Sequence, residues 1–332
     1  MFEFYFLSCF NPNHGLLSLN LYEGSCSFLI APEKNINTIK NIKLAKFAGF
    51  CYGVKRAVEL TERIKQDNPD KAVYILGQLI HNNQVIEYLD NIGIKTVYGI
   101  DEIPDNSNGV CIIRTHGATP DTIKQLEEKG CEIVDATCPD VKKVQDRARQ
   151  LTDEDYKVII IGRADHPEVI AIKANADLNS KDESIVISST DEAFEYLDKI
   201  KNSKKIGVVI QTTQKMENFK GILPIIVENA KELRIYNTIC AATSNRQKAA
   251  VELAQESDLM VVVGSKSSAN TTHLTEILSG IKNTIHIETH QDLEKYNDIF
   301  EKSRNIGVTA GASTPENVIN DVINVLKKGE YK

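Results

Sequence analysis

Short apolar runs rich in valine and isoleucine recur along this chain, and a helical pattern follows most of them. Each run is too short for a helix and is bounded by glycine or polar residues, which is typical of a buried strand. Alternating strands and helices predict an α/β protein with mostly parallel sheets, in which ligands bind beyond the carboxyl ends of the strands. The runs are AVYIL (72–76), VCII (110–113), KVIII (157–161), GVVI (207–210), LMVVV (259–263) and NIGV (305–308), and the helical patterns include 54–64, 83–92, 141–151 and 245–255.

Composition narrows the class of protein. The chain has 332 residues, so we expect two or three domains, and a hydrophobic share of 42% excludes a mostly disordered chain. The net charge of −7 argues against a dedicated nucleic-acid binder, and the absence of tryptophan weakens any role that depends on base stacking. No apolar stretch approaches the length of a membrane span.

The first 40 residues differ from the rest. Residues 1–10 are apolar but carry Glu3 where a secretory signal needs positive charge, and residues 1–40 contain no arginine, which argues against a transit peptide. We therefore expect residues 1–41 to be a poorly ordered N-terminal extension or the product of a wrongly assigned start. Without an export signal, the odd number of cysteines (seven) predicts free thiols and a reducing cytoplasm.

Three cysteines share one local context. Cys51, Cys138 and Cys240 each precede a helical pattern with basic residues from about the fourth position on, as in CYGVKRAVEL, CPDVKKVQDRA and CAATSNRQKAA. This weak repeat suggests three α/β domains in pseudo-threefold packing, with boundaries at 42–137, 138–239 and 240–332 and the thiols at the centre. We expect Cys111 and Cys131 to be buried as small hydrophobes, and we assign no role to Cys9 and Cys26.

Thiols at helix starts suit a metal group. A helix N-terminus lowers the pKa of a thiol, and the thiolate is the form that binds metal. Three distant thiolates fit an iron–sulfur cluster or zinc, but their spacing resembles neither a zinc ribbon nor a clustered ferredoxin run. A [4Fe–4S] cluster with only three protein ligands would keep one iron open to substrate, which favours catalysis over electron transfer.

Imidazoles and hydroxyls follow other strands. His81, His116 and His166 come after predicted strands, whereas His14, His273, His286 and His290 have no comparable setting. The loops GSKSSANT (264–271) and GASTPENV (311–318) place hydroxyls and backbone N–H groups before helices, which suits an anion. There is no phosphate-loop or dinucleotide motif, so these groups together suggest a small diphosphate. We expect Glu168, close to His166, to be a general acid.

The motifs together resemble the 4-hydroxy-3-methylbut-2-enyl diphosphate reductase family over residues 42–328. The matching segments are FAGFCYGVKRAVE, GQLIHN, RTHG, DATCP, HPEV, QTT, NTIC followed by TSNRQ, VVGSKSSAN and GVTAGASTP. The resemblance implies a cloverleaf of three α/β domains around one [4Fe–4S] cluster. It also implies reductive removal of the substrate hydroxyl to give isopentenyl and dimethylallyl diphosphate, the last step of the methylerythritol phosphate route to isoprenoids, with ferredoxin or flavodoxin as electron donor.

The resemblance also assigns roles to single residues. Cys51, Cys138 and Cys240 match the cluster ligands, Glu168 matches the proton donor, and Thr212 matches the hydroxyl partner of the substrate alcohol. His166 matches a further substrate-site histidine. One position departs from the family, because Ala269 stands where a second serine is usual, and weaker diphosphate binding would follow. The residues that match the diphosphate site are His81, His116, Ser268, Asn270 and Ser313.

Two other functions remain open at this stage. A three-cysteine cluster hydro-lyase would dehydrate its substrate without net reduction, so dependence on a reductant separates it from a reductase. A non-catalytic iron–sulfur or zinc sensor would not need the hydroxyl-rich loops at 264–271 and 311–315.

Overall fold

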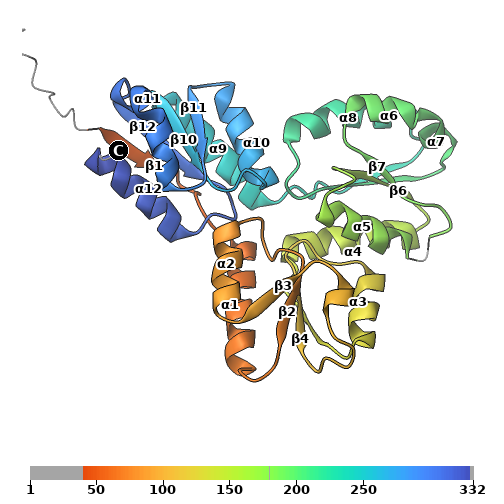
Figure 1. Cartoon of the computed structure of the whole chain (residues 1–332). Helices are drawn as coiled ribbons and strands as arrows, with labels where there is room; N and C mark the ends of the chain where they lie inside the picture. Colours follow the sequence, from red (N-terminus) through yellow and green to blue (C-terminus); the bar gives the residue numbers. More distant parts are fainter. Residues whose placement is uncertain (1–39, 179, 330–332) are drawn as a thin grey trace, which may run out of the picture. The chain divides into compact units, whose positions relative to one another are not determined.

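The computed structural model describes residues 40–178 and 180–329. The predicted extension therefore lies outside the described residues except for its last two positions, and so do Cys9, Cys26 and His14. Within the described part, three four-stranded sheets are found, and every pair of neighbouring strands is parallel (Figure 1). The predicted α/β class with mostly parallel sheets is confirmed.

Sheet 1 has the strand order β3-β2-β4-β5. Asparagine and threonine side chains cap two of its helices: Asn82 accepts from Val85 N, and Thr119 accepts from Thr122 N. The elements are α1 (Tyr52–Asp67), β2 (Val73–Leu76), α2 (Asn83–Asn91), β3 (Ile94–Val97), the 3₁₀ helix η1 (Ile100–Glu102), β4 (Val110–Ile113), α3 (Pro120–Glu128) and β5 (Glu132–Asp135).

Sheet 2 repeats this order as β7-β6-β8-β9. Proline begins both α4 and α5, where its missing N–H leaves no helical hydrogen bond unmade. The elements are α4 (Pro139–Asp153), β6 (Lys157–Ile161), α5 (Pro167–Asp177), β7 (Ile185–Ile187), α6 (Thr190–Glu195), α7 (Leu197–Asn202), β8 (Ile206–Ile210), α8 (Met216–Asn229) and β9 (Leu233–Ile235).

Sheet 3 has the order β11-β10-β12-β1, so its outer strand comes from the opposite end of the described chain. Asn41 pairs with Asn305 and Leu44 pairs with Val308. The elements are β1 (Asn41–Leu44), α9 (Ala241–Gln255), β10 (Leu259–Val263), α10 (Ala269–Ser279), β11 (Thr284–Ile287), the 3₁₀ helix η2 (His290–Tyr296), α11 (Asn297–Glu301), β12 (Asn305–Ala310) and α12 (Glu316–Lys328).

This pairing differs from the boundary that we placed at residue 42. Residues 41–44 belong to the sheet that residues 259–310 build, because β12 offers β1 a parallel edge. The inner strands at 73–76, 110–113, 157–161, 206–210, 259–263 and 305–310 lie where the apolar runs predicted them. The other domain limits, near 138 and 240, stay predictions.

Each sheet is buried on both faces, which explains its continuous apolar strands. In β6, Ile159 and Ile161 pack into one cluster and Val158 and Ile160 into another. Sheets 1 and 3 show the same division. Cys111 is fully buried in one of these cores, so its interpretation as a small hydrophobe is confirmed, and Cys131 lies in the same cluster.

Candidate active site

The three helix-start cysteines occupy equivalent places in the three sheets. Each follows the outer strand that pairs with the third strand in the order above, and each is the N-cap residue of a long helix, α1, α4 or α9. Its backbone N–H donates to a carbonyl two residues beyond the end of that third strand. The bonds are Cys51 N to Ala312 O (3.2 Å), Cys138 N to Thr115 O (3.0 Å) and Cys240 N to Thr212 O (3.1 Å).

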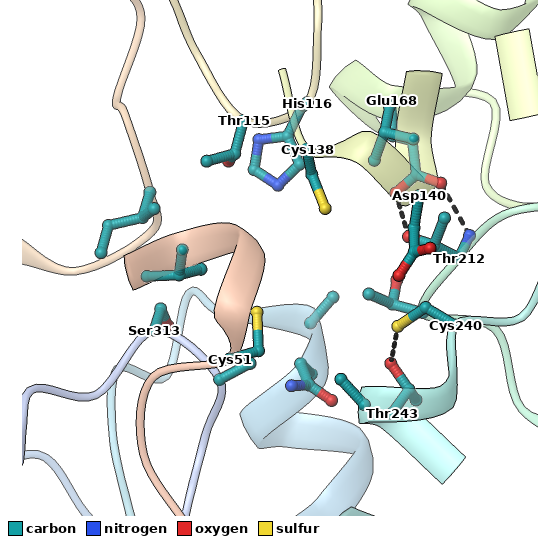
Figure 2. A pocket seen from close by; sticks show the side chains of 18 of the residues that line it. Cys51, Thr115, His116, Cys138, Asp140, Glu168, Thr212, Cys240, Thr243 and Ser313 are labelled. Carbon is teal, nitrogen blue, oxygen red and sulfur yellow. Dashed lines mark hydrogen bonds between the residues drawn. The ribbon is translucent and has the colours of Figure 1, made fainter. Parts of the chain in front are cut away.

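The side chains of all three cysteines line one cavity, and Figure 2 shows their sulfur atoms pointing into it. Gly53 lets two of these segments approach closely, because a Cβ at this position would lie 2.5 Å from the Sγ of Cys138. Cys240 Sγ also lies 3.0 Å from Thr243 Oγ1. Three thiols without disulfide bonds, drawn from three distant segments, are a donor set that fits an iron–sulfur group.

The expectation of lowered thiol pKa values is wrong for Cys138 and Cys240. Burial raises the pKa of Cys138 to about 11, although backbone N–H groups of Asp140 and Val141 in the first turn of α4 act in the opposite direction. Burial likewise raises the pKa of Cys240. The helix start does favour the thiolate at Cys138, but desolvation outweighs it, so ionisation of that thiol depends on a bound cation.

Three imidazoles form a second wall of the cavity. The ring centroids of His81 and His116 lie 4.9 Å apart, and those of His116 and His166 lie 5.3 Å apart. One ring nitrogen from each histidine lies within 4.8 Å of the other two, a spacing that suits either one metal ion or one anion held by several N–H donors. The strand-exit residues predicted from the sequence are therefore brought together.

The protonation of these histidines follows from their partners. Burial lowers the pKa of His166 to about 4, and it also lowers the pKa values of His81 and His116. His166 Nδ1 accepts a hydrogen bond from Glu168 N (3.2 Å), so neutral His166 carries its proton on Nε2. At neutral pH the three imidazoles are uncharged, and an anion that enters the cavity would favour their protonation.

Hydroxyl and amide groups of sheet 3 complete this wall. Ser313 Oγ donates to the carbonyl of His81 and lies 3.3 Å from Ser268 Oγ, so the loops of sheets 1 and 3 meet here. Asn270 and Ala269, in the first turn of α10, line the same cavity. With the imidazoles, these groups form a set of hydrogen-bond donors suited to a diphosphate.

A buried carboxyl faces the thiols from sheet 2. Glu168 is 1% exposed and accepts from Thr212 N (2.6 Å) and Thr212 Oγ1 (2.8 Å). Burial raises the pKa of Glu168 to about 7, against the effect of the two Thr212 bonds. Figure 2 shows this pair beside Cys138 and Cys240. A carboxyl with this pKa can hold and release a proton near neutral pH.

Some cavity residues were not predicted from the sequence. Thr115, Asp140, Thr213 and Thr243 also line the cavity. Thr115 directly precedes His116 in RTHG, and Asp140 lies in the first turn of α4, two residues after Cys138, so closeness to predicted residues was the available signal. Arg114, which precedes Thr115, lines a second cavity that shares no lining residue with the first. Burial lowers the pKa of His81, and the charge of Arg114 acts in the same direction.

Comparison with known proteins identifies the family. The model of the LytB protein family matches residues 42–327. The chain belongs to the LytB family. A Clostridium tetani protein named 4-hydroxy-3-methylbut-2-enyl diphosphate reductase is 46% identical over 285 residues, which are 85% of this chain and 43% of that protein. The protein of the same name from Geobacter metallireducens is 40% identical over 288 residues, 86% of this chain and 97% of its own length.

Solved structures of LytB relatives show the same fold. A structure described as (E)-4-hydroxy-3-methyl-but-2-enyl diphosphate reductase, the terminal enzyme of the non-mevalonate pathway, matches with a TM-score of 0.67 and 38% identity, covering 87% of this chain and 99% of its own. The E-1-hydroxy-2-methyl-but-2-enyl-4-diphosphate reductase of Plasmodium falciparum matches with a TM-score of 0.78 and 28% identity, covering 88% and 89%. In the described part of the chain, no helix has the length and apolarity of a membrane span.

Proposed function

We propose that this protein is a 4-hydroxy-3-methylbut-2-enyl diphosphate reductase. It removes the substrate hydroxyl as water and uses two electrons and two protons to form isopentenyl or dimethylallyl diphosphate. This is the terminal step of the methylerythritol phosphate route to isoprenoids. One observation carries the proposal: three thiols, three imidazoles and a buried carboxyl–threonine pair line a single cavity.

The diphosphate is assigned to the wall built by sheets 1 and 3. Imidazole N–H groups of His81 and His116 and the side chains of Ser268, Asn270 and Ser313 are its hydrogen-bond donors. Ala269 contributes no hydroxyl, so only its backbone N–H is available there. Because two of the loops are joined through Ser313, the donors are held in place before substrate enters, which lowers the entropic cost of binding.

Cys51, Cys138 and Cys240 would hold one [4Fe–4S] cluster by their three thiolates, leaving one iron without a protein ligand. When bound, this group supplies the electrons one at a time and a Lewis acid for the substrate hydroxyl. The three equivalent backbone anchors support the assignment, since they bring the cysteines from three sheets to one cavity.

Proton delivery is assigned to Glu168. Thr212 donates to both carboxyl oxygens from its backbone and its hydroxyl, so it fixes the orientation of the acid and lies beside the position of the substrate alcohol. Burial keeps the Glu168 carboxyl protonated to higher pH than an exposed glutamate, which suits a general acid for a poor leaving group. His166, whose Nδ1 already accepts from Glu168 N, offers its Nε2–H to the substrate.

The electron donor is an external one-electron carrier, and we propose a ferredoxin or flavodoxin. A cytoplasmic location, in which reduced thiols persist, stays part of this proposal.

The decisive test is turnover without air. The chain is reconstituted with iron and sulfide and given the hydroxylated diphosphate with a reduced one-electron dye. We expect about four iron and four sulfide per chain, and oxidation of dye that depends on substrate. Product formed without reductant would indicate a hydro-lyase, and one zinc per chain without turnover would indicate a structural metal protein; either result would contradict the proposal.

A further inference from the structure

Arg246 is a buried cation on the helix that Cys240 begins. It lies in α9 and is 3% exposed. Its Nη1 donates to the carbonyl of Phe47, in the segment that leads to Cys51, and to the carbonyl of Ala310 (3.0 Å), at the end of β12. One guanidinium therefore joins the helix of one cysteine to the loop of another.

The charge of this arginine has no acidic partner in the described part of the chain. Arg246 forms no ion pair there, and its Nε is buried without an acceptor. The carbonyls that it contacts carry only partial charge. A guanidinium remains protonated in proteins, and its burial without an anion is unfavourable because the lost hydration is not replaced. A buried arginine of this kind indicates that a negative group belongs close to it.

The ligand cysteines of the site can supply this negative charge when they are ionised. Burial lowers the pKa of Arg246, and among the described residues Cys51 and Cys240, when ionised, act in the opposite direction. An iron–sulfur group held by three thiolates carries net negative charge and becomes more negative with each added electron. A fixed positive charge near it stabilises the reduced form more than the oxidised form.

We propose that Arg246 is the internal counter-charge of the iron–sulfur site and that its charge raises the reduction potential of the bound group. Through its hydrogen bonds, Arg246 is also a positioning residue for the Cys51 loop. This inference rests on the proposed iron–sulfur function. It assigns Arg246 no contact with substrate. Two effects of one side chain must then be separated: the hydrogen bonds to Phe47 and Ala310, and the charge.

Two substitutions separate them. Arg246→Lys keeps the charge and can donate to the same carbonyls, whereas Arg246→Gln keeps an N–H donor and removes the charge. The matched control is Arg56→Gln. Arg56 also lies near the start of a cysteine-initiated helix, α1, and also donates to a backbone carbonyl, that of Thr137 (3.3 Å), but it is exposed. Charge loss at Arg56 is screened by water.

The measurement is the midpoint potential of the reconstituted holoenzyme, from a redox titration followed by electron paramagnetic resonance. We expect Arg246→Gln to lower the potential by at least the tenfold change in a one-electron equilibrium that corresponds to about 59 mV. Arg246→Lys and Arg56→Gln should change that equilibrium by less than about threefold. An unchanged potential in Arg246→Gln, or an equal fall in Arg246→Lys, would overturn the proposal.

A second measurement decides the case if Arg246→Gln does not retain iron. Urea unfolding of the iron-free proteins compares the same variants without the negative group. Because the charge then has no partner, we expect the iron-free Arg246→Gln protein to be at least as stable as Arg246→Lys. A markedly lower midpoint for Arg246→Gln would show that the fold itself needs the charge, against our inference. Failure of the proposed function would appear differently, as absence of iron or turnover in the unsubstituted protein.

Discussion

The two walls of the cavity are built on opposite principles. The thiol wall uses the same device three times: an outer strand, a cysteine that begins a helix, and a backbone bond to the exit of a neighbouring strand. The polar wall differs in every sheet, with imidazoles from sheet 1, an imidazole, a carboxyl and a threonine from sheet 2, and hydroxyls and an amide from sheet 3. Equivalent ligands suit a compact inorganic group, whereas an elongated substrate with a charged end and a reacting end needs unlike neighbours.

The largest expected effect comes from breaking the equivalence of the thiols. Cys138→Ser should lose the visible absorbance of the cluster and lower kcat by about 100-fold or more, since even partners beyond the ligands change metal affinity or activity by 10–100-fold. Cys51→Ser and Cys240→Ser should behave alike. Cys131→Ser, at a cysteine outside the cavity, is the control. Full iron content and activity in Cys138→Ser would remove it from the ligand set.

The next largest effect tests the part of the polar wall that sheet 2 contributes. Glu168→Gln keeps the shape and can still accept from Thr212, but it cannot supply the proton. We expect kcat to fall by about 100-fold with little change in substrate affinity. Glu59→Gln, at the exposed surface of α1, should leave both constants unchanged. Normal turnover in Glu168→Gln would exclude the acid role.

The pH profile checks the same residue independently. Because the pKa of Glu168 lies near 7 instead of 4.5, the active protonated form is lost as pH rises through about 7, and kcat should fall there. The sign for stability agrees: between pH 4.5 and 7 the folded state keeps a proton that the unfolded chain releases, so this group's contribution decreases as pH rises. The falling limb should be missing in Glu168→Gln.

A smaller effect is expected from removing the positive charge of Arg114, which acts on two of the imidazoles. Arg114 forms no ion pair in the described residues. Burial is the main cause of the lowered pKa values of His81 and His116, and the charge of Arg114 acts in the same direction. Arg114→Met removes attraction for the anionic substrate, so KM should rise by about three- to tenfold while kcat is kept. The exposed Arg304 offers the control Arg304→Met. An unchanged KM, at low as well as moderate salt, would show that Arg114 has no such role.

Sequence reasoning succeeds where one local pattern decides the structure. The inner strands are continuous apolar runs because both faces of each sheet are buried, and residues at their carboxyl ends meet because all strands are parallel. This is why His81, His116 and His166 could be grouped without knowing any distance. The cysteine context could be read in the same way, since it repeats at Cys51, Cys138 and Cys240.

What failed depends on distant parts of the chain or on competing energies. The pairing of β1 with β12 leaves no local signal, because an outer strand such as Asn41–Leu44 is short and largely exposed. The pKa values of Cys138 and Cys240 were predicted with the wrong sign because burial raises both, and burial cannot be read from spacing. Arg246 was missed because its significance lies in its burial without an ion pair in the described part of the chain, which no local pattern reveals.

The smallest expected effect is at Ala269, the position in the polar wall at which this chain departs from the family pattern. Ala269 begins α10 and lines the cavity, and Ser268 before it makes no side-chain cap. Ala269→Ser adds one hydroxyl that can donate to the diphosphate, and a net hydrogen bond of about 1 kcal/mol predicts a roughly fivefold lower Kd. Calorimetric titration without reductant measures this, with Ala242→Ser at the thiol wall as control. An unchanged Kd would mean that the backbone N–H of Ala269 already satisfies that oxygen. The two walls would then differ in composition, but less in how well they tolerate a substitution.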